Sequence, residues 1–138
     1  TQGVSSAASD VYKRQEIISF TKKNNVKLAL STSTTINNVE AVFKSLSNQI
    51  SKEDFHFIGN RSLVKYEKPN PEIYKLTLEK LNLEPDNCLA IEDTEESSKS
   101  AVSAGIKCIG FPGDYHSDDS FEMCIKKVKI LDQSLFSL

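Results

Sequence analysis

Cys88-Leu89-Ala90-Ile91-Glu92-Asp93 is a short apolar run that ends in two adjacent carboxylates, and Thr94-Glu95-Glu96 follows as the expected start of a helix. The stretch predicts a buried strand with two acids at its carboxyl end. Neighbouring carboxylates repel each other, so one would take up a proton unless a cation compensates them. Mg²⁺ suits this role because it binds one or two carboxylates together with water and a substrate phosphate. The alternative is that Glu92 and Asp93 only cap the next helix, whose first turn favours negative charge.

A cluster of hydroxyl side chains follows an earlier predicted strand. Residues 26–30 run into Ser31-Thr32-Ser33-Thr34-Thr35, and helical spacing of apolar residues begins at Ile36. Side-chain donors and free backbone N–H groups converge between a strand end and a helix N-terminus, so this cluster is a candidate phosphate site. An ordinary helix N-cap explains the same residues, and the stretch alone favours the N-cap.

Lys68-Pro69-Asn70-Pro71 precedes another predicted helix. Asn70 is a good N-cap, and Pro71 is a good first helical residue. The inward face of this helix is expected to carry Tyr74, Thr77, Leu78 and Leu81. Lys68 therefore lies just outside a helix N-terminus, in an extended conformation because it precedes a proline. A lysine at such a position is usually solvated, and it becomes of interest only because other elements also end in ligand-type residues.

The apolar pattern predicts alternating helices and strands along the chain. Helices are expected over residues 16–25, 36–46, 71–81, 94–104 and 121–131, and strands over residues 26–30, 55–58, 88–93 and 106–111. This alternation is typical of a three-layer α/β fold with a parallel sheet. In such folds ligands bind beyond the carboxyl ends of the strands.

Composition narrows the class of protein. The 138 residues, 38% hydrophobic and 26% charged, predict one small globular domain. The net charge of -2 gives no reason to expect a nucleic-acid or membrane surface. The three cysteines have no Cys-x-x-Cys spacing, which indicates reduced thiols and favours the cytoplasm, with the plastid stroma as an alternative.

Residues 1–15 are expected to be a non-native tail. Residues 5–15 lack helical or strand periodicity and resemble the in-frame translation of a transposon-end adapter used in DNA sequencing libraries. Such a segment is set aside before the fold is considered.

Three stretches in order resemble motifs two, three and four of the haloacid dehalogenase (HAD) superfamily: Leu28–Ser33, Lys68–Tyr74 and Leu89–Thr94. Two further stretches, Thr32–Ala41 and Asp114–Phe121, are similar to CbbY-type sugar-phosphate phosphatases, which are relatives of β-phosphoglucomutase. The resemblance implies that residues 16–138 are the C-terminal portion of a HAD core domain with a Rossmann-like three-layer fold.

The resemblance also implies a reaction and a set of roles. The full-length parent would be a Mg²⁺-dependent phosphatase acting on a sugar phosphate or bisphosphate, such as xylulose 1,5-bisphosphate, and would be a monomer. Thr32, Ser33 and Lys68 would bind the phosphate, Lys68 would also neutralise charge in catalysis, and Glu92 and Asp93 would hold the metal. Alternatives are a β-phosphoglucomutase-like phosphomutase and a non-catalytic phosphate-binding relative. A receiver domain of signalling proteins combines similar residues, but there the acids come first and the Lys-Pro pair last.

Two departures from the family pattern affect these expectations. Ser97 stands where the family usually has a glycine. The first motif, Asp-x-Asp-Gly-Thr, does not occur in the 138 residues, and neither does the helical cap that usually follows it. In the family this motif supplies the nucleophile and ends a strand between those that lead to Thr32 and Asp93. We therefore expect an inactive fragment with an incomplete sheet and low stability.

Overall fold

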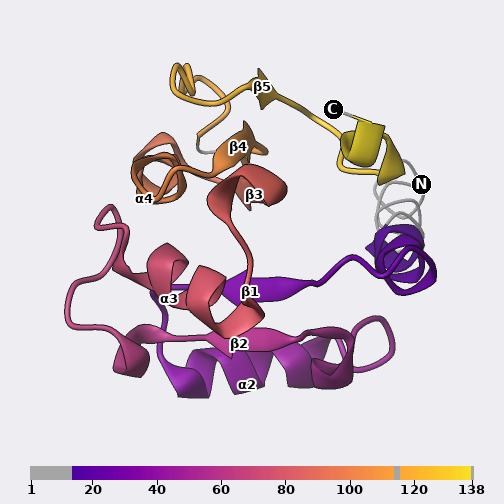
Figure 1. The fold of residues 1–138 in the computed structure, drawn as a ribbon. Coiled ribbons are helices and arrows are strands. Elements are labelled where there is room, and N and C mark those ends of the chain that lie inside the picture. Colours follow the sequence, from indigo (N-terminus) through magenta and orange to yellow (C-terminus); the bar gives the residue numbers. More distant parts are fainter. Residues whose placement is uncertain (1–13, 114–115, 138) are drawn as a thin grey trace.

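A computed structural model describes residues 14–113 and 116–137, and Figure 1 shows the arrangement of its elements. Residues 14–23 are helical. The further α-helices are α2 (Ile36–Ser45), α3 (Glu72–Leu81) and α4 (Glu95–Ser103). The strands are β1 (Ala29–Ser31), β2 (Phe57–Gly59), β3 (Leu89–Glu92), β4 (Lys107–Gly110) and β5 (Lys126–Lys127). The alternation predicted from the sequence is thus present from residue 14 to the end of β4, with shorter strands.

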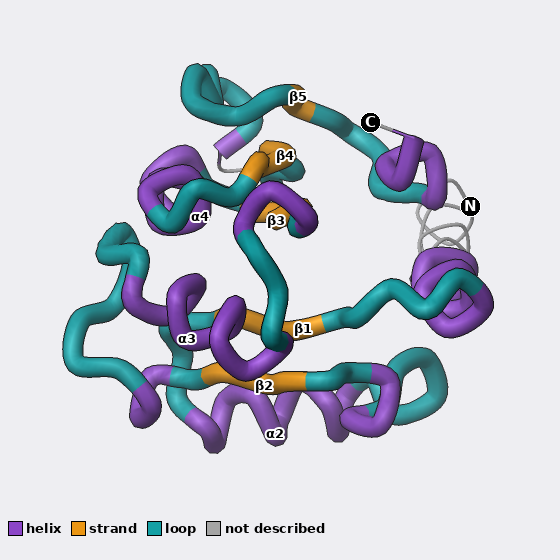
Figure 2. The backbone as a smooth tube through the Cα atoms, viewed as in Figure 1, coloured by secondary structure: helices purple, strands orange, loops and turns teal. Residues whose placement is uncertain are grey.

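The strands form two separate parallel sheets. β1 pairs with β2, with Leu30 opposite Ile58, and the second sheet has the order β3-β4-β5, with Ala90 opposite Cys108. In the described part of the chain, β1 pairs only with β2 and β3 only with β4, and the tube view separates the two sheets clearly (Figure 2). The predicted α/β class with parallel strands is confirmed, and the described residues place no strand between β1 and β3.

Helix α3 joins the two sheets. It packs against β1, β2 and α4, and its buried side chains are Ile73 together with the four that the sequence pattern predicted: Tyr74, Thr77, Leu78 and Leu81. Polar contacts tie it to both sides. The hydroxyl groups of Thr77 and Ser31 in β1 lie 2.7 Å apart, and the Ser100 hydroxyl of α4 donates to the Asn70 carbonyl oxygen over 2.7 Å.

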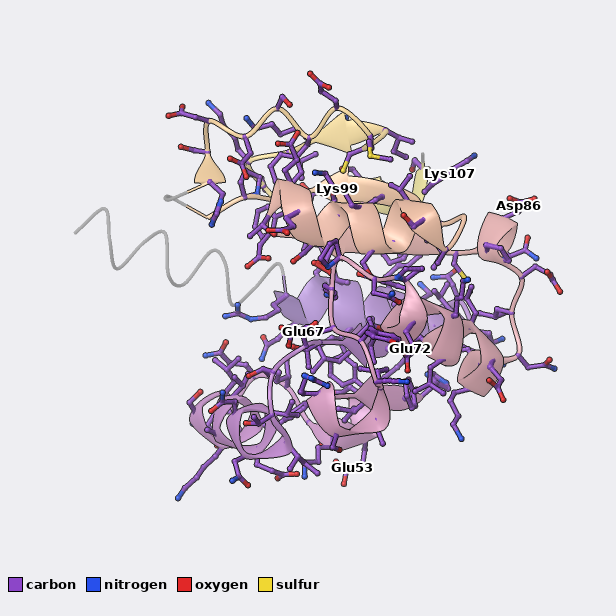
Figure 3. All side chains as sticks on the ribbon, turned by 90° about the vertical axis from the view of Figure 1, so that its left-hand side faces the viewer. Glu53, Glu67, Glu72, Asp86, Lys99 and Lys107 are labelled. Carbon is purple, nitrogen blue, oxygen red and sulfur yellow. The ribbon has the colours of Figure 1, made fainter. Side chains whose placement is uncertain are left out.

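The start of α3 organises the loop that precedes it. The helix begins at Glu72, so its N-cap position is Pro71 and not the predicted Asn70. The Asn70 side-chain oxygen still accepts a hydrogen bond from the Glu72 N–H over 3.0 Å. The Glu72 carboxylate, labelled in Figure 3, accepts from the backbone N–H groups of Lys65 (2.7 Å) and Tyr66 (3.0 Å). These two hydrogen bonds lower the pKa of Glu72 and hold the loop that carries Lys68 against the helix.

The predicted helix over residues 121–131 is wrong. Phe121 has a positive φ of 53°, which a helix does not allow, and its ring is buried. The Ile125 N–H bonds the Cys108 carbonyl oxygen over 2.9 Å, and the Val128 N–H bonds that of Gly110 over 2.8 Å. Pairing with β4 therefore replaces the helical hydrogen bonds, and β5 forms in place of the helix.

The predicted tail lies largely outside the described residues, since the description begins at residue 14, and residues 114 and 115 of the predicted CbbY-like stretch also lie outside it. At the other end, residues Gln133–Ser137 form a 3₁₀ helix, and the Phe136 ring stacks on Phe20 with 4.3 Å between ring centroids. No helix in the described ranges has both the length and the apolar character needed to cross a membrane.

Candidate functional site

The two predicted metal ligands stand at the end of β3. Glu92 is its last residue and is buried, and Asp93 follows as an exposed residue. The side chain that caps α4 belongs to Thr94, whose hydroxyl accepts from the Ser97 N–H over 3.0 Å. A carboxylate of the later loop, Asp119, accepts from the Glu95 N–H over 3.3 Å. Among the described contacts neither Glu92 nor Asp93 caps the helix, so both acids are free of that role.

Lys68 contacts Glu92 directly. Its ammonium group forms an ion pair with Glu92 Oε1, and the two side chains are only 10% and 7% exposed. The Tyr74 hydroxyl donates a hydrogen bond to the same oxygen over 2.6 Å. The Lys68 Nζ also lies 5.2 Å from the centroid of the Tyr74 ring, within range of a cation–π contact. Burying an ion pair is costly unless further hydrogen bonds satisfy it, and Tyr74 provides one.

The environment of Tyr74 keeps its hydroxyl protonated. Burial is the largest cause of its raised pKa, followed by the negative charge of Glu92. A phenol that stays protonated remains a hydrogen-bond donor throughout the physiological pH range. Sequence reasoning placed Tyr74 only on the inward face of α3. The available signal was that a buried tyrosine usually needs a hydrogen-bond partner for its hydroxyl.

The hydroxyl cluster follows β1 at the loop before α2. Thr35 provides the N-cap of α2, since its hydroxyl accepts from the Asn38 N–H over 3.3 Å. Thr32 accepts from the Thr34 N–H over 3.2 Å, so its own proton can still be donated. The Ser33 hydroxyl accepts from the Lys68 N–H over 3.2 Å. Thr32 and Ser33 are therefore separate from the helix cap, and Ser33 is joined to the lysine loop.

These contacts bring the predicted site residues together. Lys68 bonds through its backbone to Ser33 and through its side chain to Glu92. Thr32 directly precedes Ser33 in the chain, and Asp93 directly follows Glu92. The contacts therefore join the hydroxyl cluster, the lysine and the acid pair, although they lie far apart in the sequence.

The donor set fits a hard cation in part. Both contacts to Glu92 use Oε1, so in the described part of the chain no hydrogen bond or ion pair occupies Oε2. Asp93, the next residue in the chain, is exposed. No group of three or more His, Cys, Asp or Glu side chains within the described ranges is arranged to hold a metal ion. Two carboxylate ligands suit Mg²⁺, which usually completes its shell with water and substrate phosphate.

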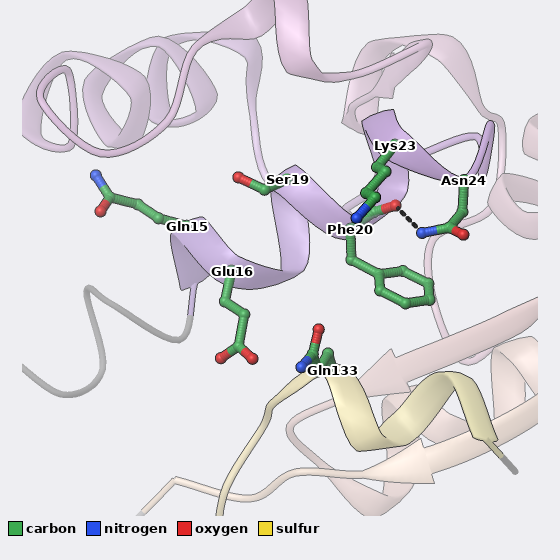
Figure 4. A pocket seen from close by; sticks show the side chains of 7 residues that line it. All are labelled: Gln15, Glu16, Ser19, Phe20, Lys23, Asn24 and Gln133. Atoms are coloured by element: carbon green, nitrogen blue, oxygen red, sulfur yellow. Dashed lines mark hydrogen bonds between the residues drawn. The ribbon is translucent and has the colours of Figure 1, made fainter.

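A separate pocket of about 580 Å³ lies between the helix of residues 14–23 and the C-terminal segment (Figure 4). It is lined by Gln15, Glu16, Ser19, Phe20, Lys23, Asn24 and Gln133. None of the five predicted site residues belongs to it. A second, more open hollow is lined by residues on both sides of Lys68, including Tyr66, Glu67 and Pro69.

Comparison with known proteins identifies relatives. The family model described as haloacid dehalogenase-like hydrolase matches residues 8–111. Protein CbbY of Cereibacter sphaeroides is 33% identical over 106 residues, which cover 77% of this chain and 46% of that protein. The phosphorylated carbohydrates phosphatase of Thermotoga maritima is 38% identical over 96 residues, which cover 69% of this chain and 43% of that protein.

A similar fold is found among solved structures. The crystal structure of a CbbY variant from Rhodobacter sphaeroides in complex with xylulose 1,5-bisphosphate aligns with a TM-score of 0.79 and 30% sequence identity. The alignment covers 85% of this chain and 52% of that one. The chain thus spans about half the length of the relatives that it matches.

Proposed function

This chain belongs to the haloacid dehalogenase-like hydrolase family, and from that premise we propose that its site serves Mg²⁺-dependent phosphoryl transfer from a phosphorylated sugar in the full-length protein. One observation carries the proposal: Lys68 bonds to Ser33 through its backbone and to Glu92 through its side chain. These contacts support a site in which the Lys68 ammonium group lies between the hydroxyl cluster and the acid pair. Phosphoryl transfer depends mainly on such positioning and on charge neutralisation.

Each residue has a role that its contacts permit. The Thr32 hydroxyl has a proton left to donate to a phosphoryl oxygen, and the Ser33 amide would donate beside it. The Lys68 ammonium group would neutralise negative charge on the phosphoryl group, and its ion pair with Glu92 would hold the ammonium group in place. Glu92 Oε2 and the Asp93 carboxylate would hold the cation. When bound, Mg²⁺ would supply further positive charge at the phosphoryl oxygens.

The nucleophile is expected to come from another part of the full-length protein. Members of the family use an aspartate of an Asp-x-Asp-Gly-Thr motif, and the 138 residues do not contain this sequence. We therefore expect no turnover by the 138-residue chain alone. Among substrates we place a pentulose bisphosphate first, because a CbbY structure similar to this chain is in complex with xylulose 1,5-bisphosphate.

The test uses the full-length protein and a panel of sugar phosphates. Phosphate release should require Mg²⁺, and Asp93→Asn should lower kcat/KM by about 10²–10³-fold, the usual cost of one electrostatic contact to a reacting group. Glu96→Gln removes an exposed carboxylate from the first turn of α4, three residues after Asp93, and should leave the rate unchanged.

Two results would contradict the proposal. Full activity of Asp93→Asn would show that the acid pair does not hold the cation. If an isomeric sugar phosphate formed and no free phosphate were released, the enzyme would be a phosphomutase and not a phosphatase.

A further inference from the structure

Tyr74 contacts both members of the buried ion pair. Its hydroxyl donates to Glu92 Oε1 over 2.6 Å, and its ring lies beside the Lys68 ammonium, 5.2 Å from ring centroid to Nζ. The side chain is 7% exposed, so water competes little with either contact. Tyr74 therefore connects α3 to the end of β3.

The helix that carries Tyr74 is itself held in place on two sides. Thr77, one turn further along α3, bonds to Ser31 at the end of β1, and Ser100 of α4 bonds to the Asn70 carbonyl oxygen just before α3. The Tyr74 hydroxyl is thus presented to Glu92 from a fixed support. A carboxylate with one oxygen bonded to two fixed donors loses most of its rotational freedom.

We propose that Tyr74 is a positioning residue whose hydroxyl, together with Lys68, fixes Glu92 through Oε1 and so keeps Oε2 available for the divalent cation. This inference rests on the metal-binding role proposed for Glu92 and adds the group that orients it. Partners that orient metal ligands in this way commonly contribute 10- to 100-fold to metal affinity.

The experiment measures binding of Mn²⁺ alone to the full-length protein, from the electron paramagnetic resonance signal of free Mn²⁺. Tyr74→Phe keeps the ring, its packing and its contact with Lys68, and removes only the hydroxyl. We expect its dissociation constant for Mn²⁺ to rise about 10- to 100-fold. Glu92→Gln should abolish the same binding, which locates the ion at this site.

Two control variants separate positioning from general stability. Thr77→Val removes another buried hydroxyl from the same face of α3, one that bonds to Ser31 and Ile73 and not to Glu92. Tyr66→Phe removes the hydroxyl of an exposed tyrosine. Tyr66→Phe should bind Mn²⁺ as the wild type does, and Thr77→Val, which removes one support of α3 but leaves the Tyr74 hydroxyl in place, should lose clearly less affinity than Tyr74→Phe.

The outcomes distinguish the inference from the function on which it rests. If the wild type binds Mn²⁺ and Tyr74→Phe binds it equally well, the positioning role is wrong and the metal site stands. A loss in Thr77→Val as large as that in Tyr74→Phe would show a structural effect of α3 and would also overturn it. If the wild type does not bind Mn²⁺, or Glu92→Gln binds it unchanged, the metal role of Glu92 fails, and the inference fails with it.

Discussion

Cys108 has no exposed surface and packs in the core formed by α3, α4, β3 and β4. Burial is the main cause of its raised pKa, and the neighbouring Cys124 thiol raises it further. The thiolate is the form that reacts with alkylating reagents. A raised pKa lowers the thiolate fraction at neutral pH, and burial blocks the reagent, so both effects protect this residue.

The protection of Cys108 can be measured by alkylation with iodoacetamide followed by peptide mass mapping. In the native chain Cys108 should react at least about tenfold more slowly than it does in urea, because reaction requires local opening. Cys88 and Cys124, which are partly exposed, provide internal references. Equal rates for all three thiols under native conditions would show that this core is not formed.

Among single residues, the sequence could propose as candidates those whose chemical type and position at the end of an element are informative. Glu92 and Asp93 follow an apolar strand, and Lys68 precedes a helix, so their meeting could be expected from a parallel sheet. The ion pair between Lys68 and Glu92 and the hydroxyl of Tyr74 could not be predicted, because they depend on how far α3 lies from the end of β3. That distance is set by tertiary packing and not by local pattern.

At the scale of elements, the contact between β4 and β5 depends on a glycine. A Cβ on Gly110 would lie 2.6 Å from Cγ of Phe121, whose ring is buried against it. This close approach positions the chain so that β5 pairs with β4. The apolar residues of 121–131 suggested a helix. Their pattern gives no information about the close approach of Phe121 to Gly110, which depends on tertiary packing.

Gly110→Ala should displace Phe121 and weaken the β4–β5 pairing by about 1–3 kcal/mol, the usual cost of overpacking. Hydrogen exchange of the Ile125 and Val128 amides, which bond to β4, should become roughly 5- to 150-fold faster. Gly113→Ala is the matched control, since a Cβ there meets no atom within 4 Å. Unchanged exchange in Gly110→Ala would mean that the ring moves aside at no cost.

Helix α3 shows why other elements were predictable. The apolar stripe is a local signal for the buried face of a helix, and that face was confirmed. The predicted start was one residue too early, because the N-cap is Pro71 and not Asn70. β5 has only two residues and is defined by its partner strand, so no local signal could indicate it.

At the scale of the whole molecule, the chain has two sheets joined by α3 and by the Lys68–Glu92 ion pair. In the part of the chain that the structure describes, one edge of β1 and one edge of β3 have no strand partner. Unpaired strand edges favour association with other chains. Since the links described between the sheets are α3 and one ion pair, we expect the sheets to lose structure separately.

Heating of the purified 138-residue chain should therefore give a broad transition by circular dichroism, and sedimentation velocity should show association that increases with concentration. A single sharp transition of a monomer would contradict this expectation. Adding Mn²⁺ tests the link between the sheets, because a ligand that binds only the folded site stabilises it by mass action.

The edge of β1 that has no strand partner among the described residues also has a practical consequence for preparing the protein. An apolar peptide of about five residues, the typical length of a strand, could add to that edge through main-chain hydrogen bonds. Co-expression with such a peptide should increase the yield of soluble chain, whereas a version with a central proline should not, because proline removes a donor that strand pairing requires. The recovered yield would then report how well a given peptide completes the sheet.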